Sequence, residues 1–384
     1  SSNGFGGFPR DTTASQDSTA YYIDLEADVS DALTLQAAVR YEDFSVFGGT
    51  TNYKLAGIYR VSDNLRVRFA RSTGFHAPTS GQASITNVTT QNQLINGVPT
   101  LVDQGTLPLS SAAGQLAASF VESQSGVRPE LGTEDADNYS FGIAVDVDAF
   151  SFTLDYYNIK VTDRIALGAN VDFLDALNAV NGDSYTQVGL ALAGLDADGT
   201  IDRQNFVGLD DLSQFRFFTN AFGTNTQGLD LVGSVDLDAM GGMSTLTFAF
   251  NYNETEVPAQ YVGDGFLQID GDRRSALEDQ LPNIKGNVAW SHTAGNLRTL
   301  IRANYYGPWR STSNGYNADA TTMIDLQLAY QVNENLEVVV GADNLFDEYP
   351  DKNPGRGGSG QLYPEDSPFG FNGGSWYVQG RYNF

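Results

Sequence analysis

Hydrophobic and polar residues alternate with a period of two along much of this chain, and the last ten residues show the alternation most clearly. Trp376, Val378, Gly380, Tyr382 and Phe384 fall on one face, and Tyr377, Gln379, Arg381 and Asn383 fall on the other. Successive side chains of a β-strand point to opposite faces, so this segment is predicted to be a strand with one apolar, aromatic face. A strand of about ten residues with such a face suits a bilayer-spanning β-barrel. A half-buried terminal strand of a soluble sheet would show the same pattern, so this segment alone leaves both structures open.

The same alternation recurs in about fourteen segments between Ala20 and Phe384. Clear examples are 33–41, 65–69, 141–147, 246–250, 324–330 and 336–340. Short turns alternate with long connections near 74–136, 162–212, 255–280, 307–319 and 347–374. Short turns at one end and long loops at the other are typical of outer-membrane barrels. We therefore predict an all-β fold, in which residues 1–384 form a single domain of antiparallel transmembrane β-barrel with long extracellular loops. Short helices are expected at 112–123 and 173–180.

Composition excludes several classes of protein. The 384-residue chain has no cysteine, a formal net charge of -26 and a mean hydropathy of -0.26. No disulfide or thiolate metal site can form, and so acidic a chain is not expected to bind nucleic acid. No run approaches the roughly 18 apolar residues of a transmembrane helix. Residues 1–8 lack the basic and apolar regions of a signal peptide and are predicted to be a loop, so we expect the sequence to be a mature protein or a piece of one.

An Asp-rich turn is the best candidate for a metal site, and no other cofactor is expected. Asp196, Asp198 and Asp202 follow the pattern Asp-x-Asp-Gly-x-x-Asp, in which glycine permits a tight turn and carboxylates can converge on Ca²⁺. Gly194 and Asn205 occupy the first and last ligand positions of a complete calcium loop, so any binding would be weak, with Kd of about 10⁻⁴–10⁻³ M. A solvated turn without metal is the simpler alternative.

Four side chains are candidate ligand contacts. Arg66 and Arg68 alternate with apolar residues and should point into the barrel, where they would contact a plug or an anionic ligand, or pair with carboxylates of the channel wall. Trp309 and Tyr316 belong to a long connection, where they could stack on a ligand or join an interfacial aromatic girdle. The two histidines lie far apart and no nucleophile or zinc motif occurs, so we predict no catalytic residues and no enzymatic activity.

Several stretches resemble the C-terminal barrel half of TonB-dependent outer-membrane receptors. The segment at 71–79, Arg-Ser-Thr-Gly-Phe-His-Ala-Pro-Thr, is similar to a strand end where the family has Gly-Phe-Arg-Ala-Pro, with His76 in place of the arginine. Further similarities are Arg-Pro-Glu at 128–130, the strands at 138–142 and 154–165, Asp-Asn-Leu-Phe-Asp-Glu-Tyr at 343–349, and the aromatic terminus. Each match is weak alone, but the matches occur in the family's order across nearly the whole chain.

The resemblance implies a barrel of about twenty-two strands with a plug domain in its lumen. It places the protein in the outer membrane of a Gram-negative bacterium, surrounded by lipid, and implies that the barrel-assembly machinery recognises the terminus through Trp376, Val378, Tyr382 and Phe384. No plug, which would contact the TonB complex, is expected in the residues before Ala20. The plug and roughly eight strands would therefore lie in another chain or elsewhere in the protein, or be cleaved off near residues 1–18.

Three functions follow as expectations. The resemblance implies active uptake of a scarce nutrient powered through TonB, with an iron–siderophore chelate as the commonest cargo and corrinoids, haem and oligosaccharides as others. A self-contained passive porin or fatty-acid channel of fourteen strands is one alternative, and an adhesive surface barrel that uses Ca²⁺ is another. The receptor predicts that the last strand pairs near 336–343 and has a free second edge, whereas the channel predicts that it pairs with 20–28.

Overall fold

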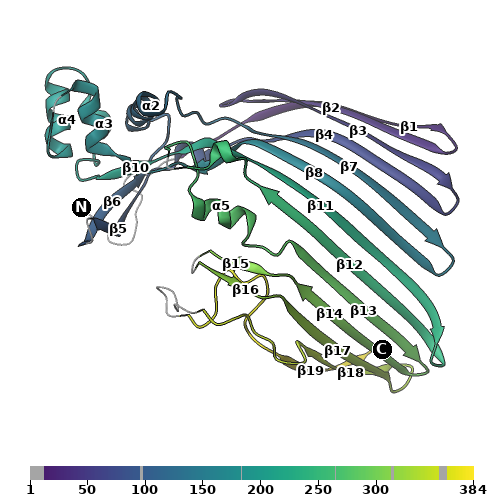
Figure 1. Ribbon diagram of the computed structural model, residues 1–384. Helices are drawn as coiled ribbons and strands as arrows, with labels where there is room; N and C mark the ends of the chain where they lie inside the picture. The colour runs from purple at the N-terminus through teal and green to yellow at the C-terminus, as the bar shows by residue number, and fades with distance from the viewer. Residues whose placement is uncertain (1–12, 96–97, 183, 264, 313–314, 354–360) are drawn as a thin grey trace.

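The computed structural model describes residues 13–95, 98–182, 184–263, 265–312, 315–353 and 361–384, so the loop expected at residues 1–8 lies outside the described residues. Thirteen antiparallel strands form one sheet and pair in chain order (Figure 1). They are β1 (Ser18–Ser30), β2 (Leu33–Phe44), β3 (Gly48–Ser62), β4 (Leu65–His76), β7 (Glu134–Val147), β8 (Phe150–Leu167), β11 (Phe218–Ala239), β12 (Gly242–Glu256), β13 (Ile284–Ala294), β14 (Leu297–Tyr306), β17 (Thr321–Gln331), β18 (Leu336–Asp343) and β19 (Ser375–Tyr382). The predicted fold class is confirmed. The sheet has one strand fewer than the fourteen or so expected, and six further strands form two small separate sheets in the loops.

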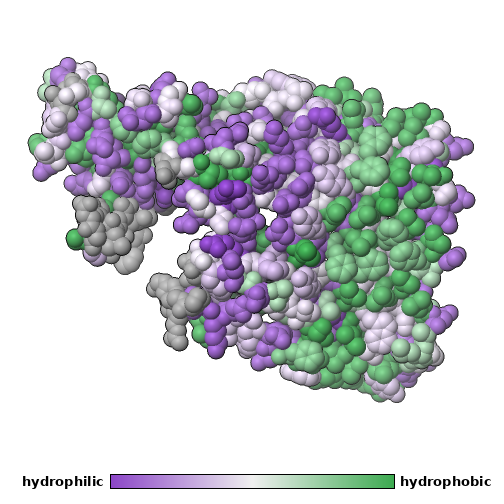
Figure 2. Space-filling view, in the orientation of Figure 1, coloured by the Kyte–Doolittle hydropathy of each residue, from purple (hydrophilic) through white to green (hydrophobic). Residues whose placement is uncertain are grey.

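The period-two pattern separates two faces of the sheet. On β19, Trp376 and Val378 are 69% and 76% exposed and lie opposite Ala342 and Val340 of β18. The alternate residue Tyr377 points to the other face, where its hydroxyl accepts a hydrogen bond from the Gln327 side chain at 2.9 Å. Figure 2 shows the result as a hydrophobic band across the strands, away from the hydrophilic loops. Such a band of exposed aliphatic and aromatic side chains suits contact with lipid.

The sheet is open in this structure. β19 pairs with β18, in register from Leu336 opposite Tyr382 to Asp343 opposite Ser375. β1 pairs with β2, and within the described residues these two terminal strands form no ladder with each other. The prediction for the last strand is confirmed, because it has one ladder partner near 336–343 and a free second edge.

Short and long connections lie at opposite ends of the strands (Figure 1). The turns 31–32, 63–64, 148–149, 240–241, 295–296 and 332–335 gather at one end. At the other end lie the short turn 45–47 and the connections 77–133, 168–217, 257–283, 307–320 and 344–374. The bounds of these five connections differ by six residues or fewer from those of the long segments expected from the sequence. Among the described residues, no helix is both long enough and apolar enough to cross a membrane.

Glycines on the strands make room for aromatic rings on the neighbouring strand. A Cβ added at Gly341 of β18 would lie 2.2 Å from the Tyr377 ring, and one added at Gly286 of β13 would lie 2.3 Å from the Phe250 ring. An aromatic ring over a cross-strand glycine covers backbone that would otherwise be bare and fixes the register of the pair. These glycines are needed for close approach, since no other residue leaves space for the ring.

Two long connections fold together into a module with its own hydrophobic core. The connection 77–133 supplies α1 (Ser80–Ser84), β5 (Asn87–Ile95), β6 (Val98–Thr106) and α2 (Ala112–Ser125). The connection 168–217 supplies β9 (Val171–Asp172), α3 (Phe173–Asn181), α4 (Val188–Ala197), η1 (Arg203–Phe206) and β10 (Gln214–Arg216). A four-stranded sheet in the order β5-β6-β10-β9 joins them, with β10 parallel to β6. We call this unit the loop module.

The core of the loop module forms where the helices pack on that sheet. Phe173, Leu177, Leu192 and Phe215 are completely buried in it. Both helices expected from the sequence are present as α2 and α3. The Ser111 side chain caps the N-terminus of α2. Both helices end at a glycine in the left-handed conformation. Each helix is short, and each is stabilised by packing against the other connection.

Asn220 ties the base of the loop module to the strands below it. Its side-chain amide donates to the carbonyls of Gly132 and Thr133 at 3.2 and 3.3 Å, and its carbonyl oxygen accepts from the Gly132 backbone N–H. The Asn220 backbone N–H donates to the Glu130 carbonyl at 2.9 Å. β11 is irregular here, with register shifts between 220 and 224. Through these hydrogen bonds, β11 holds residues 130–133, the segment that follows α2, in place.

Candidate functional site

The two arginines predicted to face the interior lie on the polar face of β4. Arg66 forms an ion pair with Asp146 of β7, and the Arg68 guanidinium forms a two-pronged ion pair with Asp155 of β8, with Nε 2.7 Å from Oδ1. Gly142 of β7 lies beneath the second pair, and a Cβ there would collide with the Asp155 carboxylate. Arg68 therefore reaches across β7 because that position has no side chain. Both arginines are engaged by wall carboxylates, and contact with a plug or ligand stays a prediction.

The two predicted aromatic contacts come together in a small hairpin. Trp309 lies in β15 (Trp309–Ser311) and Tyr316 in β16 (Tyr316–Ala318), with ring centroids 6.4 Å apart. Trp309 is buried, whereas the Tyr316 hydroxyl donates to the Asp351 carbonyl at 3.0 Å. Burial, followed by the Asp351 and Asp366 carboxylates, raises the pKa of Tyr316. In this arrangement the pair packs the hairpin against the 344–374 connection, and its contact with a ligand stays a prediction.

Asp366 fixes the same hairpin to the loop before β19. Its carboxylate accepts from the Ser311 hydroxyl at 2.9 Å and from the Thr312 backbone N–H at 2.8 Å. The Tyr306 ring at the end of β14 packs on Phe369, with centroids 5.1 Å apart. These contacts make the loop end of β14 and the 344–374 connection one packed surface at the mouth of the sheet.

The carboxylates of the Asp-rich turn cap backbone N–H groups. Asp196 Oδ1 accepts from the Arg203 N–H, Asp198 Oδ1 from the Thr200 N–H and Asp202 Oδ1 from the Gln204 N–H, each at 2.9 Å. In the part of the chain that the structure describes, no three His, Asp or Glu side chains are grouped closely enough to hold a metal ion. The turn has a structural role as the end of α4 and the start of η1, and the Ca²⁺ site stays a prediction for titration.

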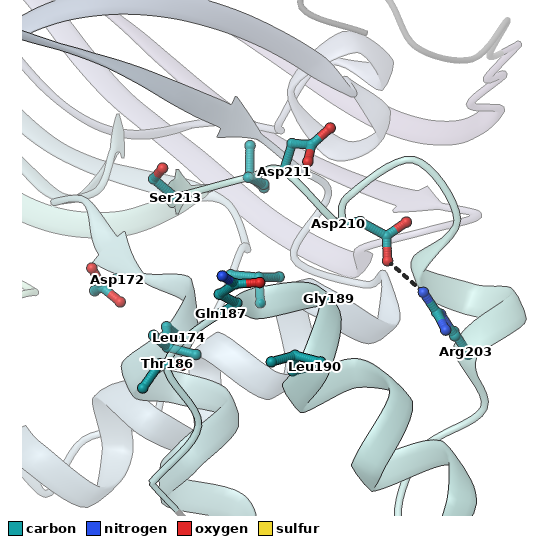
Figure 3. A pocket seen from close by; sticks show the side chains of 12 residues that line it. Asp172, Leu174, Thr186, Gln187, Gly189, Leu190, Arg203, Asp210, Asp211 and Ser213 are labelled. Carbon is teal, nitrogen blue, oxygen red and sulfur yellow. Dashed lines mark hydrogen bonds and ion pairs between the residues drawn. The ribbon is translucent and has the colours of Figure 1, made fainter.

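A cavity of about 590 Å³ opens in the loop module at the start of α4 (Figure 3). Asp172, Asp210 and Asp211 line it together with Arg203. Arg203 Nη2 lies 3.0 Å from Asp210 Oδ1, and Asp172 caps α3 through the Asp175 N–H. Arg203, Asp210 and Asp172 thus form contacts within the loop module itself. The sequence patterns did not identify them as candidate site residues.

The residues expected to form the assembly signal end the sheet. Trp376, Val378 and Tyr382 project from the exposed face of β19, and the Tyr382 and Phe384 rings pack edge to face with centroids 5.1 Å apart. Their recognition by the assembly machinery stays a prediction. His76, at the loop end of β4, has Nδ1 3.7 Å from Glu134 Oε2, so a carboxylate neighbours the position where the resemblance expects arginine.

An open antiparallel sheet with an apolar band, a polar face lined by ion pairs and long folded loops at one end has the features of the wall of a membrane β-barrel. The family model of the TonB dependent receptor-like β-barrel matches residues 1–345. The chain therefore belongs to the TonB-dependent receptor family, whose barrel sits in the outer membrane. A search of curated proteins gives no match.

Siderophore receptors are among the solved structures that this chain resembles. The ferric enterobactin receptor PfeA of Pseudomonas aeruginosa is 14% identical, with a TM-score of 0.64 over 100% of this chain and 48% of its own. The siderophore receptor PirA of Acinetobacter baumannii is 16% identical, with a TM-score of 0.61 over 96% of this chain and 46% of its own. The sequence given thus spans about half the length of these receptors, and at this identity the likeness shows the fold.

Proposed function

We propose that this barrel wall belongs to an outer-membrane receptor that imports an iron–siderophore chelate, using energy delivered by TonB through a plug domain. Family membership over residues 1–345 carries the proposal. The names of the similar solved structures, a ferric enterobactin receptor and a siderophore receptor, support this class of cargo. Family and structural neighbours are transport receptors rather than enzymes.

The open edges of the sheet support a barrel completed by further strands. β1 and β19 each present one row of backbone groups with no ladder partner among the described residues. Every unsatisfied backbone group in hydrocarbon costs several kcal/mol, so a sheet of this kind is stable in lipid only when other strands pair with both edges. A lumen of that larger size suits a plug. The self-contained channel loses support, because it requires β1 to pair with β19.

The experiment measures uptake by the complete receptor that carries this barrel. An iron-starved Gram-negative host without its own siderophore receptors expresses it and is given radioactive iron bound to enterobactin, a catecholate, or to a hydroxamate or a citrate chelate. We expect at least one chelate to accumulate, and we expect accumulation to stop in a host that lacks TonB while binding to the cell surface persists. Equal uptake with and without TonB would refute active transport. Failure to take up any of the three chelates would refute siderophore import.

A further inference from the structure

The edge strand β1 carries a row of three carboxylates that have no cationic partner. Asp24, Glu26 and Asp28 occupy alternate positions and are exposed, about 7 Å apart along the strand. The Gln36 side chain donates to Asp24 at 3.1 Å, and the Thr34 hydroxyl donates to Asp28 at 2.6 Å. None of the three carboxylates forms a salt bridge with any part of the chain that the structure describes. Three negative charges therefore stand in line on β1 without compensation.

Several carboxylates elsewhere on this face of the sheet are paired with arginines. Ladder registers connect Asp28 to Arg68 through one residue on each of β2 and β3, so the three carboxylates of β1 lie on the polar face. On that face the ion pairs include Arg66–Asp146, Arg68–Asp155, Arg298–Glu337 and Arg381–Glu337. The cation of the adjacent strand β2, Arg40, is already paired with Glu42. The adjacent strand therefore has no free cation for the carboxylates of β1.

The second edge of β1 is free to take another strand. Among the described residues, β1 has one ladder partner, β2. β1 and β19 both run from the end of the long connections toward the end of the short turns, so they cannot form an antiparallel pair. The strands of this sheet pair in chain order, which places the segment preceding β1 on its free edge. Siderophore receptors with this fold are about twice as long as this sequence, which is chain enough for such a strand.

We propose that the strand preceding β1 in the complete receptor carries arginine or lysine on its polar face, opposite or diagonal to Asp24, Glu26 and Asp28. Opposite charges across an antiparallel ladder stabilise a sheet, and a chemically matched strand fixes its own register. Leu25, between the carboxylates, is 65% exposed on the apolar face, so the matching strand should alternate cations with apolar residues. A slip of one residue would carry the cations into lipid, where they are costly. This inference rests on the proposed completion of the barrel by further strands and is independent of TonB and of the cargo.

Disulfide cross-linking of the complete receptor in isolated outer membranes identifies the neighbour of β1. The sequence contains no cysteine, so Glu26→Cys adds a single thiol to it. Single cysteines placed along the preceding segment should oxidise fastest at the residue opposite position 26, because cross-strand Cβ atoms lie about 4.5–5.5 Å apart. We expect that residue, or one two positions away on the same face, to be arginine or lysine in the native receptor. Leu25→Cys is the control, and it should cross-link to an apolar position.

A double-mutant cycle then measures the charge pair by urea unfolding in lipid vesicles. Glu26→Gln and the replacement of the opposite cation by glutamine are compared singly and together. We expect the folding equilibrium constant to show a coupling of about two- to five-fold, which decreases as salt is raised. Additive effects at low salt overturn the proposal, as do uncharged or acidic residues at all three polar-face positions or a cross-link from position 26 to β19. Glu26 is exposed, so Glu26→Gln should fold. Since no uptake is measured, failure of siderophore import leaves the result standing.

Discussion

The loop module should unfold as one unit when its core is damaged, and α4 offers a matched pair of leucines to test this. Leu192 is completely buried against α3, whereas Leu190, two residues earlier on the same helix, is 56% exposed. Leu192→Ala and Leu190→Ala remove the same atoms from the same helix and have the same effect on helix propensity. Any difference between the two variants therefore reports on packing in the core.

The magnitude follows from burial. Truncation of a fully buried leucine costs about 3 kcal/mol, because transfer free energy is lost and a cavity is left. Truncation of an exposed leucine changes stability by about 0.5 kcal/mol or less. A loss of about 3 kcal/mol raises the population of the open module about a hundred-fold, since about 1.4 kcal/mol corresponds to a factor of ten.

Hydrogen exchange followed by mass spectrometry on the detergent-solubilised receptor measures this opening. Peptides from α3, α4 and β10 lie in one connection, and the peptide of β6 lies in the other. In Leu192→Ala we expect all four to exchange about a hundred-fold faster, because β10 pairs with β6. Peptides of the wall strands β13 and β14 serve as the internal control and should not change. Leu190→Ala should match the native protein throughout.

Two results would contradict the reasoning. If Leu192→Ala exchanges no faster than Leu190→Ala, the buried contact does not stabilise the module. If α4 alone exchanges faster while β6 keeps its protection, the two connections do not form a cooperative unit, and the shared four-stranded sheet adds little stability.

Three further predictions concern single contacts. Gly341→Ala should destabilise the barrel by about 1–3 kcal/mol, because its new Cβ would collide with the Tyr377 ring. Gly380→Ala is the control and should be neutral, because no atom lies within 4 Å of its new Cβ. Both effects are measured as the temperature at which the gel band of the folded barrel disappears. Burial and two nearby carboxylates raise the pKa of Tyr316. The absorbance titration of the native protein minus that of Tyr316→Phe should therefore show this phenol ionising above its ordinary value of 10.0. Because the folded state favours the neutral phenol, the stability that Tyr316 contributes should be lost as the pH rises through the raised pKa. Asn220→Ala should cost about 1–3 kcal/mol, because it leaves clamped backbone groups without partners, and proteolysis of the clamped segment should quicken.

The wall of the barrel could be predicted from the sequence because its determinants are local. In β19, each side chain faces lipid or the polar interior, so the period of two is visible in the residues themselves. The antiparallel neighbours are joined by short turns or follow each other along the chain, so pairing in chain order needs no long-range information. The inward orientation of Arg68 followed from the same rule, whereas its partner Asp155 did not, because nothing local links β4 to β8.

The loop module could not be predicted because its determinants are non-local. β6 and β10 pair in parallel although more than a hundred residues separate them, and parallel pairs carry no turn signal. The first part of β11 is packed on both sides and bulged near Asn220, so it lacks the alternation that marked the other strands. The helices α2 and α3 were visible from their patterns, but the surface on which they pack was not.

The two parts of the molecule therefore follow different rules of stability. The large side chains that are fully buried, such as Phe173 and Phe215, lie almost entirely in the loops, and there the penalty for a truncation follows the volume removed. The wall exposes its large hydrophobic residues to lipid, and it is held by ladder hydrogen bonds, by cross-strand contacts such as Gly341 with Tyr377, and by ion pairs on the polar face. Replacing a large hydrophobic residue by alanine severely destabilises a buried core, but the same replacement at the exposed Val378 of the wall should have a mild effect. A single methyl group at Gly341 should matter more, since it would displace the Tyr377 ring that packs there.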